Sequence, residues 1–300
     1  MVSPPRIVIY ATNTNFFLNT MKRFPALVLS CAALLNSFCG FSWGPTGHDV
    51  VAAIAEAHLT PKTQATLDQL LGGHSIVYYS SWMDNIQNSP YWEAGYKQTK
   101  TWHYANVDKG ETYQSMKKNE AGDVVVATER LVSELKNNYE NLTDSMRADY
   151  VKMIVHMVGD MHCPMHAGRL SDLGGNRTKV RWFGRNTNLH SVWDSKIVES
   201  ARNWSYSEWR DQLDRPNRGL EDEFYESVSS GTIEEWFVET VENASVIYEY
   251  VEGKEENPNL SYQFVYDFSP MLENRLLVGG YRLAYVLNSI FDPEGVQPNK

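Results

Sequence analysis

Near its middle the chain reads His156-Met-Val-Gly-Asp160-Met-His162-Cys-Pro-Met-His166, a stretch that predicts a helix ending in a metal-binding turn. His156 and Asp160 are four residues apart, so in a helix they share one face and can bind one metal ion. His190 and Asp194 repeat this spacing further along the chain. Two such pairs favour more than one metal ion.

Each of these residues also has a simpler interpretation. A lone histidine is usually a hydrogen-bonded core or surface residue, and each aspartate could only orient its histidine. Three observations together favour a metal site over these alternatives. Pro164 ends the first helix so that His166 can fold back, Asp84 follows the aromatic Trp82, and other candidate ligands occur at His48 and His103. For either helix alone, the ion-pair interpretation stays open.

The rest of the chain predicts one helical domain. Its 300 residues are 42% hydrophobic and 12% aromatic, which excludes a disordered protein. Strand-like sequence is scarce, and residues 178–183 are the best candidate for half of a small β-hairpin that turns near Gly184. No repeat or linker divides the chain, so we expect a single all-α domain over residues 43–294 and a tail over 295–300. Helical periodicity marks residues 46–59, 62–71, 124–139, 145–161, 189–201, 233–251 and 270–291.

Residues 1–42 are typical of a secretory signal peptide. Residues 24–35 are apolar, Lys22 and Arg23 precede them, and the small residue Ser42 precedes Trp43. We expect the natural start at Met21 and cleavage before Trp43, which would export the protein to the periplasm or the medium. Because 1–42 contains three positive charges and no negative ones, cleavage changes the formal net charge from −10 to −13.

The mature chain would keep a single cysteine, Cys163, which we interpret as a packing residue. With no internal disulfide, its stability must come from the core or from bound metal. No apolar run approaches the roughly 20 residues that a membrane-spanning helix needs, so no membrane insertion is expected. Nothing in the sequence indicates an obligate protein partner.

These residues occur in blocks whose order and spacing resemble those of the S1/P1 nucleases, which are zinc-dependent secreted enzymes of a helical fold shared with zinc-dependent phospholipase C. The resemblance covers about 150 residues, and its length makes it specific. The blocks are Trp43-Gly-Pro-Thr-Gly-His48, Ser81-Trp-Met-Asp84, His103-Tyr-Ala-Asn106, the stretch from His156 to His166, Asp172-Leu-Gly-Gly-Asn176 and Asn188-Leu-His-Ser-Val-Trp-Asp194.

The resemblance implies three Zn²⁺ ions per chain. The first would bind the α-amino group and carbonyl of Trp43, together with His48 and Asp160. The second would bind Asp84, His103, His156 and Asp160, so that Asp160 bridges two ions. The third would bind His166, His190 and Asp194. His58, His74 and His162 have no ligand role in this scheme, and His162 is expected to support the ligands or the core.

The same resemblance implies an endonuclease for single-stranded DNA and RNA that leaves 5′-phosphate ends and also acts on 3′-nucleotides. Asp84 would orient or deprotonate the attacking water. Tyr104 would stack on a base, although it could instead be a core aromatic, and Asn106 and Asn176 would hydrogen-bond the base edge.

Three features depart from the usual picture. Many family members have Asp where this chain has Asn106, so their base preference cannot be transferred. Several family members have Lys or Arg where this chain has Gln87, so rate or substrate range could differ. The acidic net charge is also unlike the basic surface that ordinarily binds nucleic acid. The basic residues beside the predicted site could supply a local attraction, or they could only be the solvated face of a hairpin. They are Arg169, Arg177, Lys179, Arg181 and Arg185.

Two alternative functions stay open. A zinc-dependent phospholipase C would share the helical fold, the three zinc ions and the amino-terminal Trp43. The short spacing from Trp43 to His48, the aspartate at Asp194 and the residues Tyr104 and Asn176 argue against it. A non-catalytic zinc-binding or nucleotide-binding relative is suggested only by Gln87. Turnover separates this second alternative from an enzyme, whereas metal content does not.

Overall fold

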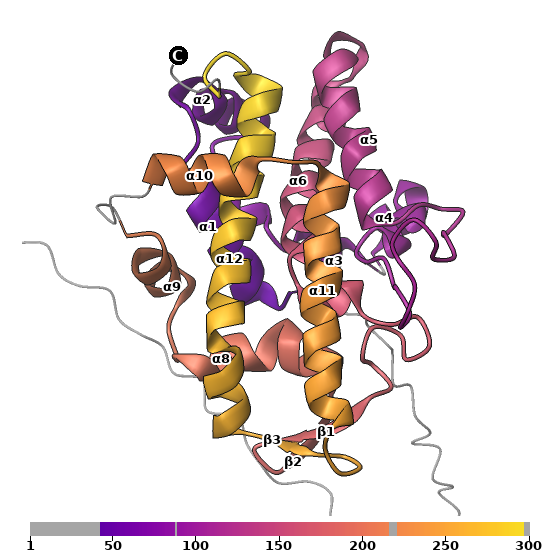
Figure 1. Ribbon diagram of the computed structural model, residues 1–300. Coiled ribbons are helices and arrows are strands. Elements are labelled where there is room, and N and C mark those ends of the chain that lie inside the picture. Colours follow the sequence, from indigo (N-terminus) through magenta and orange to yellow (C-terminus); the bar gives the residue numbers. More distant parts are fainter. Residues whose placement is uncertain (1–42, 88, 216–220, 297–300) are drawn as a thin grey trace, which may run out of the picture. The chain divides into compact units, whose positions relative to one another are not determined.

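Helices form most of the structure, as predicted (Figure 1). The computed structural model describes residues 43–87, 89–215 and 221–296, so the predicted signal peptide and the residues 297–300 lie outside the described part. In that part no helix is long and apolar enough to cross a membrane. The helices are α1 (Pro45–Ala57), α2 (Pro61–Leu70), α3 (Trp82–Ile86), α4 (Pro90–Gly95), α5 (Val124–Asn137), α6 (Asp144–Met161), α7 (Leu189–Ser191), α8 (Ile197–Ala201), α9 (Tyr206–Leu213), α10 (Glu221–Ser229), α11 (Ile233–Glu252) and α12 (Tyr262–Phe291).

Helix α6 lies at the centre of the packing. It contacts α1, α3, α5 and α12, while α1 also packs against α9 and α12. Thr143 caps α6 by accepting a hydrogen bond from the Met146 amide at 3.3 Å, and the helix ends at Met161, three residues before Pro164. Because neighbours surround its second half, His156 and Asp160 have no exposed surface. The sequence pattern therefore places polar ligand-type residues inside the apolar core.

The second His–Asp pair lies on a helix that is interrupted, where one continuous helix over 189–201 was predicted. The chain forms α7, then a π-helical turn η5 (Val192–Lys196), then α8. A π-helical turn inserts an extra residue into a helix, and such turns are frequent at functional sites. His190 ends up in α7 and Asp194 in the π-helical turn, and both are buried.

The last helix is longer than predicted. We expected it to begin at Pro270, but α12 begins at Tyr262 and Pro270 lies inside it. Proline removes one helical hydrogen bond, a cost that packing can outweigh. Phe264 and Phe268 are buried and pack with their rings 4.5 Å apart, so the turn before the proline is held by the core.

The predicted hairpin is present and gains a third strand. Strand β1 (Lys179–Trp182) pairs antiparallel with β2 (Arg185–Asn188), and Gly184 has the positive φ of +82° that the tight turn requires. A short strand β3 (Asn259–Leu260) pairs parallel to β1, on its other side. This long-range pairing has no signal in the local sequence.

Candidate metal centre

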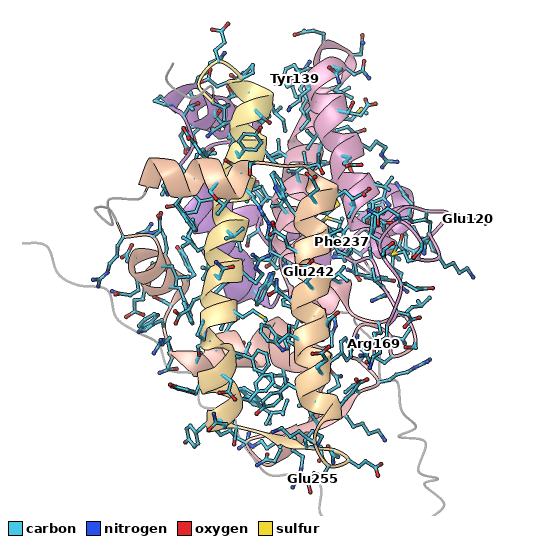
Figure 2. The ribbon with its side chains drawn as sticks, in the orientation of Figure 1. Glu120, Tyr139, Arg169, Phe237, Glu242 and Glu255 are labelled. Atoms are coloured by element: carbon cyan, nitrogen blue, oxygen red, sulfur yellow. The ribbon has the colours of Figure 1, made fainter. Side chains whose placement is uncertain are left out.

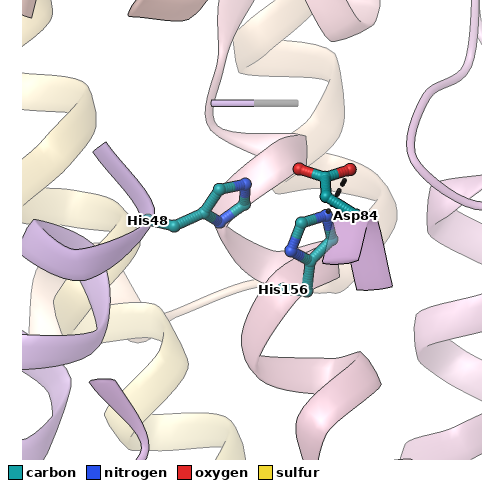
Figure 3. Close-up of side chains that lie close together, drawn as sticks. All are labelled: His48, Asp84 and His156. Carbon is teal, nitrogen blue, oxygen red and sulfur yellow. Dashed lines mark ion pairs between the residues drawn. The ribbon is translucent and has the colours of Figure 1, made fainter. Parts of the chain in front are cut away.

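Four segments of the chain bring the first group of predicted ligands to one place. Asp160 in α6 is the central residue: its Oδ2 lies 3.0 Å from His103 Nδ1 and 3.2 Å from His156 Nε2, and its Oδ1 lies 3.3 Å from His48 Nε2. Asp84 Oδ1 lies 3.7 Å from both His103 Nδ1 and His156 Nε2. Figure 3 shows the side chains of His48, Asp84 and His156 converging from α1, α3 and α6.

A second group of predicted ligands adjoins the first. His166 lies in the 3₁₀ turn η4 (Pro164–Ala167), and its Nε2 is 3.6 Å from Asp194 Oδ1. The rings of His166 and His190 have their centres 5.2 Å apart. Trp43 is fully buried, and the amide of the next residue, Gly44, donates to the main-chain oxygen of Asp194 at 2.5 Å. The structure therefore brings Trp43, the predicted start of the mature chain, beside this second group.

Three histidines are oriented in the same way. The Nδ1–H of His156 donates to the Ser80 carbonyl at 2.8 Å, that of His166 to the His103 carbonyl at 2.6 Å, and that of His190 to the Gly174 carbonyl at 2.7 Å. A carbonyl can only accept, so in each ring Nδ1 carries a proton and Nε2 is the nitrogen left to bind a metal ion. Metal-ligating histidines are typically held in this manner.

Several buried polar atoms of the site have no hydrogen-bond partner. They are His48 Nδ1 and Nε2, Asp160 Oδ1 and Asp194 Oδ1. Leaving a buried polar group unpaired is costly, and native proteins rarely accept it without a compensating ligand or water. Imidazole nitrogens and carboxylate oxygens are the donors that Zn²⁺ accepts, so the residues present fit this ion.

The two buried aspartates have opposite pKa shifts. Burial alone would raise the pKa of Asp160, but the charges of His156 and His166 and hydrogen bonds from the histidines hold it well below its usual range. Burial raises the pKa of Asp194 well above its usual range, because its neighbours compensate less. An ionised Asp194 therefore needs additional positive charge, which a divalent cation can supply.

The histidines differ in a similar way. Burial, together with the nearby His156, lowers the pKa of His48 to about 4. Burial also works against protonation of His156, but the charges of Asp160 and Asp84 outweigh it and raise the pKa of His156 to about 9. Metal binding at His156 must therefore release a proton at neutral pH.

Three groups of buried or partly buried side chains could each hold one metal ion, and their members agree only in part with the predicted ligand sets. His103, His156 and Asp160 form one group, as expected for the second ion. His48 groups with Asp84 and His156 as well as approaching Asp160. Cys163, predicted as a packing residue, lies close to His166 and Asp194 and is fully buried. The assignment of nine ligands to three ions stays a prediction.

The predicted substrate residues lie beside the centre but do not all line one pocket. Tyr104, which is 36% exposed, and Asn106 line a pocket of about 450 Å³ together with Leu170 and Lys117. Asn106 Nδ2 already donates to the Gly168 carbonyl at 2.9 Å. Asn176 is not among the residues that line this pocket, and its Nδ2 donates to the Leu173 carbonyl within its own loop at 2.9 Å.

Sequence reasoning did not identify the groups that hold the ligands in place. The carbonyls of Ser80, His103 and Gly174 carry no residue-type signal, because any residue has a carbonyl. Gln87, which was noted as a departure, has its Nε2 3.4 Å from Asp84 Oδ1 and 3.3 Å from His103 Nε2. It therefore lies at the edge of the centre.

The three histidines without a predicted ligand role make other contacts. His58 Nε2 lies 2.8 Å from Asp214 Oδ2, and His74 stacks on Tyr78. His162 donates from Nδ1 to the Val158 carbonyl at 2.7 Å, and its Nε2 lies 3.2 Å from the Arg282 guanidinium of α12. His162 thus links the end of α6 to α12 and supports the core behind the centre.

Sequence comparisons agree with this geometry. The sequence model of the S1/P1 nuclease family matches residues 43–292. Endonuclease 4 of Arabidopsis thaliana is 28% identical, with 91% of this chain and 96% of the relative aligned. Nuclease S1 of Aspergillus oryzae is 28% identical over 58% of this chain and 61% of the relative, and nuclease P1 of Penicillium citrinum is 27% identical over 52% and 58%. The chain therefore belongs to the S1/P1 nuclease family, whose members hydrolyse phosphodiester bonds in nucleic acids.

Proposed function

We propose that this nuclease is an exported, zinc-dependent endonuclease that cleaves single-stranded DNA and RNA and also dephosphorylates 3′-nucleotides. The observation that carries the proposal is the buried cluster around Asp160, whose carboxylate oxygens lie 3.2 to 3.3 Å from His156 Nε2 and His48 Nε2, and in which His48 Nδ1 and Nε2, Asp160 Oδ1 and Asp194 Oδ1 lack hydrogen-bond partners. Three Zn²⁺ ions would be held by Trp43, His48, Asp84, His103, His156, Asp160, His166, His190 and Asp194. Bound zinc supplies the Lewis acidity that makes water a nucleophile near neutral pH.

Asp84 is the group best placed to handle the proton of the attacking water. Its side chain is 21% exposed, whereas those of His103 and His156 beside it are 4% and 0% exposed. Asp84 can therefore reach both the buried ligands and the solvent that delivers substrate. We propose that it orients the water and accepts its proton as the water oxygen attacks phosphorus. The bond from phosphorus to the 3′-oxygen breaks, and the leaving oxygen takes up a proton from solvent, which gives a 5′-phosphate and a 3′-hydroxyl.

The pocket beside the centre supports a preference for unpaired bases. Tyr104 offers an aromatic face, and stacking on such a face tolerates any base at about 1 to 3 kcal/mol each. A base can enter this pocket only when it is not stacked and paired in a duplex. Asn106 would contact the base edge from the same pocket. Asn176 would need to exchange its hydrogen bond with the Leu173 carbonyl for one with the base.

The proposal of export is based on the sequence of residues 1–42. Cleavage of the signal peptide would also produce one of the proposed zinc ligands. Removal of these residues would free the α-amino group of Trp43, which is buried next to the residues of the second ligand group. Processing would then create the first metal site, so that the nuclease becomes complete only after it leaves the cytoplasm.

The experiment that tests this function uses protein that begins at Trp43. We would measure hydrolysis of single-stranded DNA, double-stranded DNA, RNA, 3′-AMP and a phosphatidylcholine analogue, with and without a chelator, and count bound zinc by elemental analysis. The proposal predicts about three zinc ions and chelator-sensitive cleavage of the single strands and 3′-AMP. Cleavage of the lipid alone would replace it with a phospholipase, and zinc binding without any turnover would replace it with a non-catalytic protein.

A further inference from the structure

Tyr248 of α11 joins its helix to a loop through two hydrogen bonds of its hydroxyl. It is 3% exposed, and its hydroxyl donates to Asp172 Oδ1 at 2.8 Å and accepts from the main-chain amide of Arg169 at 3.1 Å. Burial and the negative charge of Asp172 raise the pKa of the phenol, so the hydroxyl keeps its proton and remains a donor. One side chain of α11 therefore holds two points of the loop over residues 168–176.

Asp172 in turn forms hydrogen bonds with the turn that follows it. Its Oδ1 also accepts from the Gly175 amide at 2.8 Å, and its Oδ2 accepts from the Thr178 hydroxyl at 2.5 Å. Gly174 and Gly175 have positive φ angles of +64° and +83°. A Cβ at Gly174 would lie 2.7 Å from the Met165 carbonyl oxygen, so glycine here lets the protein's own backbone approach closely.

This turn in turn orients a predicted zinc ligand. The Gly174 carbonyl accepts from His190 Nδ1 at 2.7 Å, and the His190 amide donates to the Gly175 carbonyl at 3.3 Å. Both the ring and the main chain of His190 are therefore held by the two residues that Asp172 fixes. The path from Tyr248 to His190 consists of three hydrogen bonds of 2.7 to 2.8 Å, the carboxylate of Asp172 and the single peptide unit that joins Gly174 to Gly175.

Two ion pairs on the protein surface reinforce the contact of Tyr248 with the loop. The Arg169 guanidinium lies 4.1 Å from the centre of the Tyr248 ring and forms an ion pair with Glu252, one turn further along α11. Lys109 Nζ lies 3.2 Å from the other oxygen of Glu252. Figure 2 labels Arg169 beside the C-terminal half of α11. This use of Arg169 differs from the predicted one, since its charge is paired with the protein.

We infer that Tyr248 is a positioning residue for the metal centre, which sets the orientation of His190 through Asp172 and the Gly174-Gly175 turn. The inference rests on the proposed zinc-binding role of His190. Residues that orient a ligand directly typically contribute 10 to 100-fold to metal affinity. Tyr248 does not contact His190 itself and acts through Asp172, so we expect the lower end of this range. Its hydroxyl should contribute about tenfold to the affinity of one zinc ion.

Tyr248→Phe tests this inference, because phenylalanine keeps the ring under Arg169 and removes only the hydroxyl. Tyr250→Phe is the matched control: it lies on the same helix, and its ring packs on Phe264 and Phe268 at 5.4 and 5.2 Å. Zinc affinities would be measured by chelator competition, and the Co²⁺-substituted proteins would be compared by their visible absorption. The unfolding midpoint of each metal-free protein would also be measured.

The expected result for Tyr248→Phe is one zinc ion bound about tenfold more weakly and an altered Co²⁺ spectrum, neither of which Tyr250→Phe should show. The metal-free unfolding midpoint of Tyr248→Phe should also fall, because two buried hydrogen bonds are lost. Asp172→Asn should weaken the same ion at least as strongly. Wild-type zinc affinity in both variants would overturn the inference, as would a loss that is equal in Tyr250→Phe. If the unaltered protein bound no zinc at all, the proposed function would fail instead, so the two failures are distinguishable.

Discussion

Asp160 and Asp194 illustrate how identical local patterns acquire different properties. Each follows a histidine by four residues, and each is buried. Asp160 is approached by His103, His156 and His166, which lower its pKa, whereas the histidines near Asp194 do not offset its burial, so its pKa is raised. Spacing therefore predicts that both residues can bind metal, but only the neighbours decide how strongly each needs it.

Asp84 is the residue whose chemistry is most directly testable. Asp84→Asn keeps a ligand oxygen but removes the carboxylate that accepts a proton, so hydrolysis of single-stranded DNA should fall by about 10² to 10⁴-fold. Most of the bound zinc should remain. Asp68→Asn, at an exposed position on α2, is the control and should retain full activity. Full activity of Asp84→Asn would show that this carboxylate has no part in the chemistry.

The amino group of Trp43 provides a second test at the residue scale. A protein with two extra residues before Trp43 has an amide in place of the α-amine, and an amide nitrogen is a poor zinc ligand. We expect this protein to bind one zinc ion fewer and to lose most of its activity. Elemental analysis and single-strand cleavage, compared with protein beginning at Trp43, measure both effects. Undiminished turnover would mean that Trp43 does not bind metal.

At the scale of helices, the contact between α1 and α12 depends on a glycine. A Cβ at Gly280 would lie 2.4 Å from Ile54 Cγ2 and 2.5 Å from Ile54 Cβ. Helix α1 also carries His48, so this close contact fixes the position of the helix that holds a predicted ligand. The two helices can approach closely only because α12 presents no side chain at this point.

Gly280→Ala should therefore destabilise the protein, although alanine favours helices by about 0.5 to 1 kcal/mol over glycine. Overpacking typically costs about 1 to 3 kcal/mol, so we expect a net loss in the free energy of unfolding, measured by urea titration. Gly95→Ala at the end of α4 is the control, because no atom lies within 4 Å of a Cβ there. Equal stability of the two variants would mean that α1 moves aside without cost.

The C-terminal turn of α11 carries a pH-dependent contact. A hydrogen bond from Arg169 lowers the pKa of Glu252 to about 2 from its ordinary value of 4.5. A lowered pKa in the folded state stabilises the protein above the unfolded-state pKa, and this stabilisation is lost as the pH falls toward the folded-state value. Because the Glu252 side chain is 43% exposed, solvent screening keeps the effect small.

Glu252→Gln should accordingly be slightly less stable than the unaltered protein at neutral pH, and the difference should disappear between pH 4.5 and about 2. Urea titrations in the presence of chelator measure this difference without interference from metal release. Glu249→Gln on the same helix is the control. A difference that grows on acidification would contradict the assigned direction of the shift.

At the scale of the whole molecule, net charge and substrate charge have the same sign. The chain carries a formal charge of −10, and two of its basic residues near the site, Arg169 and Arg181, pair with Glu252 and Glu255. Arg177, Lys179 and Arg185 remain exposed on and beside the hairpin. Attraction of a polyanion would therefore come from the proposed zinc ions and a few nearby side chains, so we do not expect tight binding of long polymers.

The salt dependence of the reaction should reflect this distribution. For single strands, the logarithm of the binding constant falls by about 0.7 per phosphate contact for each decade of salt concentration. With about two phosphate contacts, we expect a slope near −1.4 for 1/KM of single-stranded DNA. The same titration with 3′-AMP is the control for effects on catalysis. A slope several times steeper would reveal an extended basic track that the charge distribution does not predict.

The sequence by itself determined the helical fold class, five of the long helices to within a few residues, and the cluster of histidines and aspartates. These features follow from local physics: helical periodicity, caps such as Thr143, and ligand spacing along one helix face. Tertiary structure alone decided the features that depend on distant contacts. They include the parallel pairing of β3 with β1, the continuation of α12 through Pro270, and the link from Tyr248 to His190. Main-chain carbonyls and buried contacts between remote segments leave no pattern in the residues themselves, because their energy depends only on what folding brings beside them.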